Sequence, residues 1–271
     1  MKISAEARKR YKDRISEHQQ QILALTDRER RGDLALQQKK ADTVMRVQLA
    51  GGNLSMVSYY VLMNGLSLTL LGVKNEGFLK EARKRLYKAL MYMEEIVTRF
   101  IDAPFSDYEE GVLSLERMGD RGKLGFVRKL GFAIDAVQTS FGENTKWKWS
   151  FAELEGRYAG VAKNMLNLKT YVAKLDPSEE GYPERVKHLS LVKQQLQRAA
   201  DRYREKYELS TLRIDDMRQA ISYLAALKRM YVLLGEAEDA DEVGKKIDVW
   251  SAKMETDLRR AGKSAKATSR G

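Results

Sequence analysis

The chain has 271 residues, a net charge of +11, three prolines and no cysteine. Without cysteine it can form no disulfide, thiolate metal site or cysteine nucleophile. Hydrophobic residues make up 43% of the sequence, which is enough for a buried core. β-Branched residues do not alternate with polar ones as they would in strands. We therefore expect an all-α protein of about ten helices, packed as antiparallel hairpins in an α-α array or an irregular bundle.

Basic charge is concentrated at the two ends of the chain. Residues 1–46 contain twelve Lys/Arg against seven Asp/Glu, and residues 259–271 contain five Lys/Arg and no acid. The second segment is rich in Gly, Ser and Ala and can bury little apolar surface, so we expect it to be disordered. The N-terminus has no apolar stretch typical of a secretory signal, which predicts a cytoplasmic protein; a mature form whose signal was removed is the alternative.

The first expected helix, 4–25, carries a short heptad seam. Its members are Tyr11, Ile15, His18, Ile22 and Leu25. The next positions in this register are Glu29 and Gly32, so the seam is expected to stop. The capping-box pattern Thr26–Glu29 predicts a second helix that runs to about Leu49 and closes at Gly51 and Gly52.

The next segment has no charged residue between Arg46 and Lys74. It is long enough to cross a bilayer, but its serines, threonine, asparagine and glycines make it less hydrophobic than a spanning helix. A helix that is apolar on all sides also occurs in protein cores. We therefore expect a fully buried central helix at 54–71, capped by Asn53, and no membrane association.

Further helices are expected at 78–101, 106–118, 123–141, 150–175, 184–209, 212–234 and 237–260. Capping-box patterns at Ser106 and Ser150 predict two of their starts, and 119–125 is expected to be a turn. The segment 176–183, with two prolines, is the expected interdomain joint. The predicted parts are the basic helices 1–52, a hairpin core 53–176, a three-helix unit 184–258 and a disordered basic tail 259–271.

Two hairpins, at about 54–95 and 220–250, resemble tetratricopeptide repeats. The first matches at Val61, Gly65, Leu68, Gly72, Ala82, Leu86 and Ala89, and the second at Leu224, Leu227, Tyr231, Gly235, Ala240, Gly244 and Ile247. The first has a five-residue insertion, the second has Lys228 where the family prefers a small residue, and both lack the terminal proline. The resemblance implies a protein–protein scaffold with a concave groove.

No residue pattern predicts a catalytic, cofactor or metal site. His18 lies on the apolar seam and is expected to pack there, and His188 is expected to be solvated. The stretch 119–125 resembles a phosphate-binding loop only loosely, because Arg117 and Leu124 replace its required Gly and Ser/Thr. Weak anion binding by Arg121 and Lys123 near a helix N-terminus is the alternative to a simple turn.

The remaining candidates are interaction residues. They are Lys146, Trp147 and Lys148, which alternate basic and aromatic side chains as single-stranded nucleic-acid sites do; Arg83, Arg85 and Lys88 on one helix face; and Arg259 and Arg260 in the tail. We expect Trp147 to pack on a neighbouring hairpin; if exposed, it is the best single hot spot. The 83–88 face is expected to be solvated, and it gains interest if it lies against the basic N-terminal helix.

These observations favour a non-enzymatic helical scaffold or adaptor that binds protein within a larger bacterial assembly. The alternative is a protein that binds nucleic acid or an anionic surface through its basic ends and Trp147. A small-molecule substrate and a cofactor are not expected, and the oligomeric state is left open.

Overall fold

The structure is a computed structural model that describes residues 3–38, 42–142 and 145–268, with side chains as far as Arg260. The described residues contain helices and turns but no strand, which confirms the all-α prediction of about ten helices. The chain divides into two compact units, residues 1–99 with 105–165 and residues 100–104 with 166–271. Each unit is described by itself.

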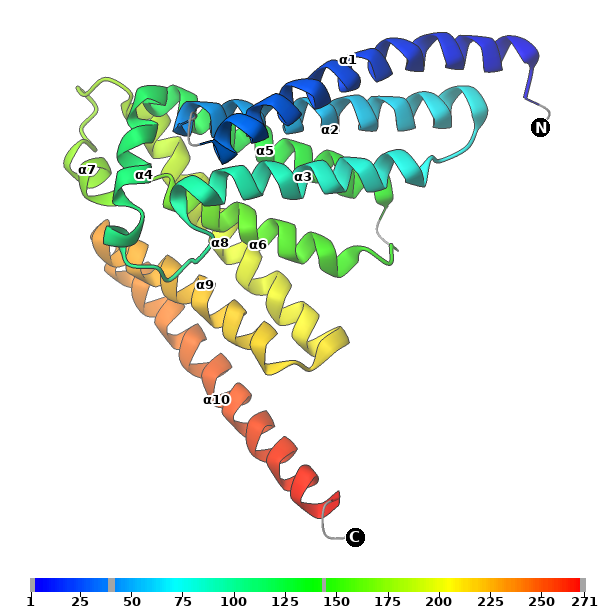
Figure 1. Cartoon of the computed structure of the whole chain (residues 1–271). Coiled ribbons are helices and arrows are strands. Elements are labelled where there is room, and N and C mark those ends of the chain that lie inside the picture. Colours follow the sequence, from blue (N-terminus) through cyan, green and yellow to red (C-terminus); the bar gives the residue numbers. More distant parts are fainter. Residues whose placement is uncertain (1–2, 39–41, 143–144, 269–271) are drawn as a thin grey trace. The chain divides into compact units, whose positions relative to one another are not determined.

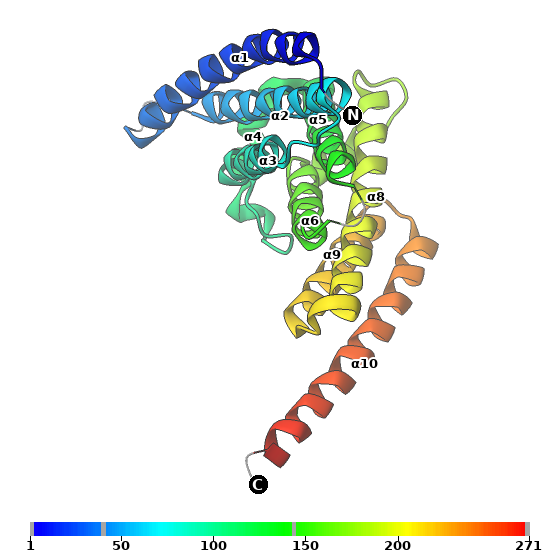
Figure 2. The ribbon, with the colours of Figure 1, turned by 90° about the vertical axis from the view of Figure 1, so that its right-hand side faces the viewer.

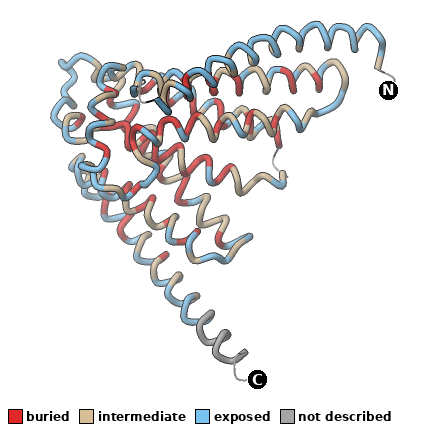
Figure 3. Tube along the Cα trace, in the orientation of Figure 1, coloured by how far each residue is buried: buried red, intermediate tan, exposed pale blue. Residues whose placement is uncertain are grey.

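The described residues of the first unit form six α-helices. They are α1 (Ala5–Gln37), α2 (Thr43–Leu71), α3 (Glu76–Val97), α4 (Glu109–Ser114), α5 (Gly119–Phe141) and α6 (Lys148–Asn164), with 3-10 turns at Phe105–Asp107 and Leu115–Met118. Figures 1 and 2 show α1, α2 and α3 side by side as long antiparallel rods. Helix α5 packs on α2 and α3, and α6 on α3 and α5. Buried residues line α3, α5 and α6, whereas α1 is exposed along most of its length (Figure 3).

Helix α1 runs without a break through the helix start expected at Thr26. The Thr26 hydroxyl donates to the carbonyl of Ile22, 2.8 Å away, instead of capping a new helix. The seam also continues, because Glu29 and Gly32 are the two buried residues of α1. A Cβ at Gly32 would lie 2.7 Å from Leu49 Cδ2, so the glycine lets α2 approach closely. The prediction that the seam stops was wrong, since it tested only for apolar side chains.

Helix α2 likewise passes through Gly51 and Gly52, which were expected to separate two helices. Its N-cap is Asp42, whose carboxylate accepts from the amides of Val44 and Met45. Asn53, the expected cap, lies in mid-helix and is wholly buried. Its amide donates to Glu29 and to the carbonyl of Leu49. The prediction of Asn53 as an N-cap was wrong, because its hydrogen bonds go to the side chain of Glu29 and to a carbonyl of its own helix.

Within the described residues α2 is also the one helix long and apolar enough to cross a membrane, by length and composition. It contacts α1, α3 and α5, so its expected central position is confirmed. Only 33% of its most apolar stretch is buried, however, which contradicts the expectation of full burial. Leu62 and Leu68 are 52% and 54% exposed.

Several other predicted boundaries moved. Helix α5 begins at Gly119, so the expected turn at 119–125 is helical. Helix α6 begins at Lys148 rather than at Ser150, because the Ser150 hydroxyl is bound by Arg83 of α3 instead of capping its own helix. The Ser106 hydroxyl bonds to Asp107, and α4 has no side-chain cap.

The second unit contains α7 (Leu168–Ala173), α8 (Tyr182–Lys206), a π-helical turn at Tyr207–Thr211, α9 (Ile214–Leu233) and α10 (Ala237–Thr268). Helices α8, α9 and α10 pack in order, as expected for the C-terminal part of the chain. Helix α10 reaches Thr268, so the disorder expected from 259 does not hold for 259–268, and 269–271 lie outside the described residues. The division between the units falls near 165, earlier than the expected joint at 176–183, and 1–52 belongs to the same unit as α3.

Two aromatic residues tie α10 to its neighbours. Trp250 is buried beneath Arg204 and Lys246, whose charged groups lie 4.9 Å and 5.0 Å from its ring. Tyr207, in the π-helical turn, donates to Asp257 Oδ2 over 2.7 Å. Burial and this carboxylate raise the pKa of Tyr207 from 10.0 to about 12.

Replacing Gly111 by alanine should destabilise the first unit. A Cβ at this position would overlap the backbone carbonyl of Ile96, which cannot move without shifting the end of α3. Overpacking of this kind costs on the order of 1–3 kcal/mol. The control is Gly65→Ala, where nothing lies within 4 Å; this helical site should gain about 0.5–1 kcal/mol. Urea unfolding followed by circular dichroism measures both, and equal stabilities would contradict the packing.

Replacing Tyr207 by phenylalanine should lower the free energy of unfolding by about 1 kcal/mol at neutral pH, because one buried hydrogen bond is lost. The folded-state pKa of Tyr207 is raised, so its contribution is full below pH 10.0 and is lost as the pH rises toward about 12. The difference in free energy of unfolding between the wild type and Tyr207→Phe, measured by urea titration, should therefore disappear over this pH range. A gap that is independent of pH would contradict the Tyr207–Asp257 bond.

Candidate functional site

Trp147 is partly buried against α3, as expected. The guanidinium carbon of Arg83 lies 3.8 Å from the centroid of its indole ring, and Lys146 Nζ lies 5.5 Å away. Arg83 also donates to the Ser150 hydroxyl over 2.7 Å. Trp147 Nε1 and Arg83 Nε are buried and have no hydrogen-bond partner in the described part of the chain. The stacking surface of Trp147 is thus occupied by the protein's own arginine.

The same interface continues along α3 and α6. Tyr87 donates to the backbone carbonyl of Ser150 over 3.2 Å, and Arg157 makes a bidentate ion pair with Glu94 while stacking on Tyr87. Bidentate pairs fix geometry as well as charge. Sequence reasoning found Arg83 and Trp147 but missed Tyr87, Glu94 and Arg157. The contacts that these three residues make join positions more than 60 apart in the chain.

Arg85 and Lys88 meet a buried acid of α1. Glu29 is 5% exposed, and Arg85 donates to its Oε2 over 2.5 Å while Lys88 donates to its Oε1 over 3.1 Å. Asn53 of α2 donates to the same Oε1 over 2.8 Å. The 83–88 face therefore lies against the N-terminal helix. Arg85 and Lys88 join three helices at Glu29, although the side chain of Lys88 remains 44% exposed.

Electrostatics keep Glu29 charged. Burial alone would raise its pKa, but hydrogen bonds from Asn53 and Lys88 and the charge of Arg85 outweigh it, so the pKa lies below its usual value. The Tyr92 hydroxyl lies 2.6 Å from Asp33 Oδ1 and 3.3 Å from Glu29 Oε1, and its single proton goes to the nearer oxygen. Burial and these two carboxylates raise the pKa of Tyr92.

The other predicted basic residues have different surroundings within their own units. Lys123 is completely buried and donates to Glu116 over 2.6 Å, whereas Arg121 is exposed on α5. Arg259 and Arg260 are exposed on α10, and Arg259 lies 3.6 Å from Glu255. Lys148 lies over the ring of Trp149 at 4.8 Å. The anion-binding alternative at 119–125 loses Lys123, because its ammonium is already paired.

A groove that sequence reasoning missed runs between α1 and α2. It has a volume of about 420 Å³ and is lined by Arg10, Asp13 and Arg14 of α1 and by Leu66 and Leu70 of α2. The signal that could have found it is the contrast between the charged start of α1 and the charge-free part of α2 after Arg46. Two antiparallel helices of this kind place a basic wall beside an apolar floor.

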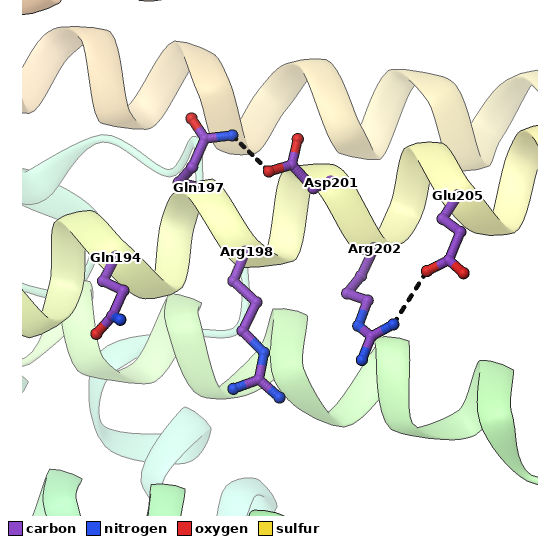
Figure 4. Close-up of a pocket in the computed structure, with 6 residues that line it drawn as sticks. All are labelled: Gln194, Gln197, Arg198, Asp201, Arg202 and Glu205. Carbon is purple, nitrogen blue, oxygen red and sulfur yellow. Dashed lines mark hydrogen bonds and ion pairs between the residues drawn. The ribbon is translucent and has the colours of Figure 1, made fainter. Parts of the chain in front are cut away.

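A second groove, of about 550 Å³, lies along α8 (Figure 4). Its lining consists of Gln194, Gln197, Arg198, Asp201, Arg202 and Glu205. Their charges are largely paired within the protein: Asp201 bonds to Gln197 and Lys246, and Arg202 to Glu205. The side chains that line this groove are all polar or charged, and they form no charge cluster of one sign.

The two histidines serve in packing. His18 lies 5.6 Å from the ring of Tyr59 on α2, as expected from its seam position. His188 was expected to be solvated, but it is fully buried edge-on to Tyr171, so that prediction was wrong. The described residues contain no group of three His, Cys, Asp or Glu side chains that could hold a metal ion.

The fold defines an all-α protein of packed helical hairpins. The chain belongs to the TP0443 family, whose sequence pattern matches residues 7–258. No curated protein and no solved structure matches the chain. The likeness to tetratricopeptide repeats stays a prediction.

Replacing Glu29 by glutamine should destabilise the first unit by about 3–5 kcal/mol, because Arg85 is left buried without a counter-charge. The pKa of Glu29 is lowered, so its stabilisation is present above its ordinary value of 4.5 and is lost as the pH falls through the folded-state pKa. The difference in free energy of unfolding between the wild type and Glu29→Gln should therefore become smaller at acidic pH. Urea unfolding at a series of pH values measures it.

The matched control is Glu95→Gln, which removes a carboxylate from a more exposed pair with Arg46, 3.0 Å away. Such pairs contribute about 0–1 kcal/mol. If the two variants lose equal stability, the buried network does not hold the helices together.

Proposed function

We propose that this protein is a non-enzymatic helical scaffold or adaptor that binds another protein within a larger assembly. The observation that carries the proposal is the exposed side of α2. This helix has no charge from Val47 to its end at Leu71, yet leucines such as Leu62 remain half exposed. Exposed apolar surface next to polar residues is typical of a protein-binding site.

The use of charge in the first unit supports this proposal. Arg83, Arg85 and Lys88 are engaged by Ser150 and Glu29, so they stabilise the fold and leave no dense basic patch on α3. Residues with the chemistry of catalysis are similarly engaged, because His18 and His188 both pack against aromatic rings. A binding role needs neither of them.

The alternative function, binding of nucleic acid or an anionic surface, retains support at the two basic ends. The side chain of Arg259 is 79% exposed, and Lys9 and Lys12 are exposed on α1. Trp147 no longer contributes to this alternative, since Arg83 covers its ring. A basic segment without an aromatic platform predicts weak, salt-sensitive binding.

A photoreactive amino acid at position 62, in the full chain in its native cells, should form a discrete protein adduct. Position 62 lies on the uncharged side of α2, where a partner would exclude water. The adduct should survive nuclease treatment, because protein forms the contact. Position 242, exposed on α10, is the control. Adducts that disappear with nuclease, or equal adducts at both positions, would contradict the proposal.

A further inference from the structure

We propose that the groove between α1 and α2 binds an acidic amphipathic helix of the partner protein. This inference rests on the proposed scaffold function and specifies its partner. The apolar side of the partner helix would lie on Leu66 and Leu70, and its carboxylates would face Arg10 and Arg14. Laying the apolar face of a helix in such a groove is a common mode of peptide recognition.

The floor of the groove is apolar along several helical turns. Leu62, one turn before Leu66, is 52% exposed and extends the floor along α2. Farther along the same side, the hydroxyls of Ser55 and Ser58 donate to the carbonyls of Gly51 and Leu54 in their own helix. These hydroxyls therefore need no outside partner, and an apolar surface can cover them at little cost.

The wall of the groove is basic. Arg10 and Arg14 lie one turn apart on α1, and together with Asp13 they give the lining a net charge of +1. Arg10 is paired with Glu6 at 2.5 Å, but both side chains are about 70% exposed, so the pair is weak and easily exchanged. Continuing the same heptad spacing along α1 passes the exposed Glu17 and then reaches the exposed Arg28 and Arg31. A carboxylate-bearing ligand thus meets positive charge at both ends of this side of α1.

The shape and charge of the groove favour a helix over three other occupants. A bilayer would place the exposed charges of Arg10, Asp13 and Arg14 against hydrocarbon together with the leucines, which is costly. Nucleic acid would meet leucines where its phosphates need cations. A second copy of this chain would bring Arg10 and Arg14 against the same residues, and the net charge of +11 opposes that contact.

The test measures binding of the full-length protein to a synthetic peptide by fluorescence anisotropy. The peptide has about 20 residues, roughly 30 Å as a helix, with leucines at i, i+4 and i+7 and glutamates beside them. We expect saturable binding, and about tenfold weaker binding to the double variant Arg10→Glu, Arg14→Glu. The matched control Arg8→Glu, Lys12→Glu makes the same charge change on exposed residues of α1 outside the groove and should bind like the wild type.

The extension of the floor is tested by Leu62→Glu, one turn from Leu66 on the same side of α2, which should also weaken binding. The control is Leu68→Glu, which has nearly equal exposure but lies on another side of the helix. Circular dichroism shows whether each variant folds. The proposal is overturned if a peptide with lysine in place of glutamate binds equally well. It is also overturned if the groove variants change only binding to anionic phospholipid vesicles or single-stranded DNA, or only self-association in sedimentation. A position-62 protein adduct without peptide binding would refute the acidic helix and leave the scaffold function standing.

Discussion

One buried carboxylate holds the first unit in its arrangement. Glu29 of α1 receives hydrogen bonds from Asn53 of α2 and from Arg85 and Lys88 of α3, so three helices meet on a single side chain. A buried acid finds its partners in one register only, and a buried polar residue can fix helix register in this way. The close approach of Gly32 to Leu49 supports the same register between α1 and α2. Glu29 adds α3 to this alignment, because Arg85 and Lys88 bind it.

This arrangement also decides which surface remains for a partner. The cations of α3 are directed at Glu29 and at Ser150, and the indole of Trp147 is covered by Arg83. Helix α1 covers only one side of α2, since its seam is a single stripe. The uncharged residues on another side of α2 stay exposed beside Arg10 and Arg14. The network around Glu29 and the groove proposed for binding therefore lie on different sides of the α1–α2 pair.

Prediction from sequence worked where the signal was local and strong. The helical class, the approximate number of helices and the order α8–α9–α10 follow from periodicity and from the placement of proline and glycine. It failed at Thr26, Gly51 and Ser150, where a residue with the chemistry of a helix end serves another purpose. Thr26 bonds within its own helix, Gly51 continues one, and Ser150 binds Arg83 of another helix. A capping pattern specifies a hydrogen-bonding capacity, and packing selects the partner.

The sequence by itself determined the helical class, the seam from Tyr11 to Leu25 and the charge-free stretch from Val47 to Val73, because these depend on spacing along the chain. Tertiary structure alone decided that Glu29 and Asn53 form a buried pair, that Arg83 stacks on Trp147, and that Leu66 and Leu70 lie beside Arg10 and Arg14. Each of these contacts joins residues more than 20 positions apart. Their geometry follows from which helix faces meet, and no local pattern contains that information.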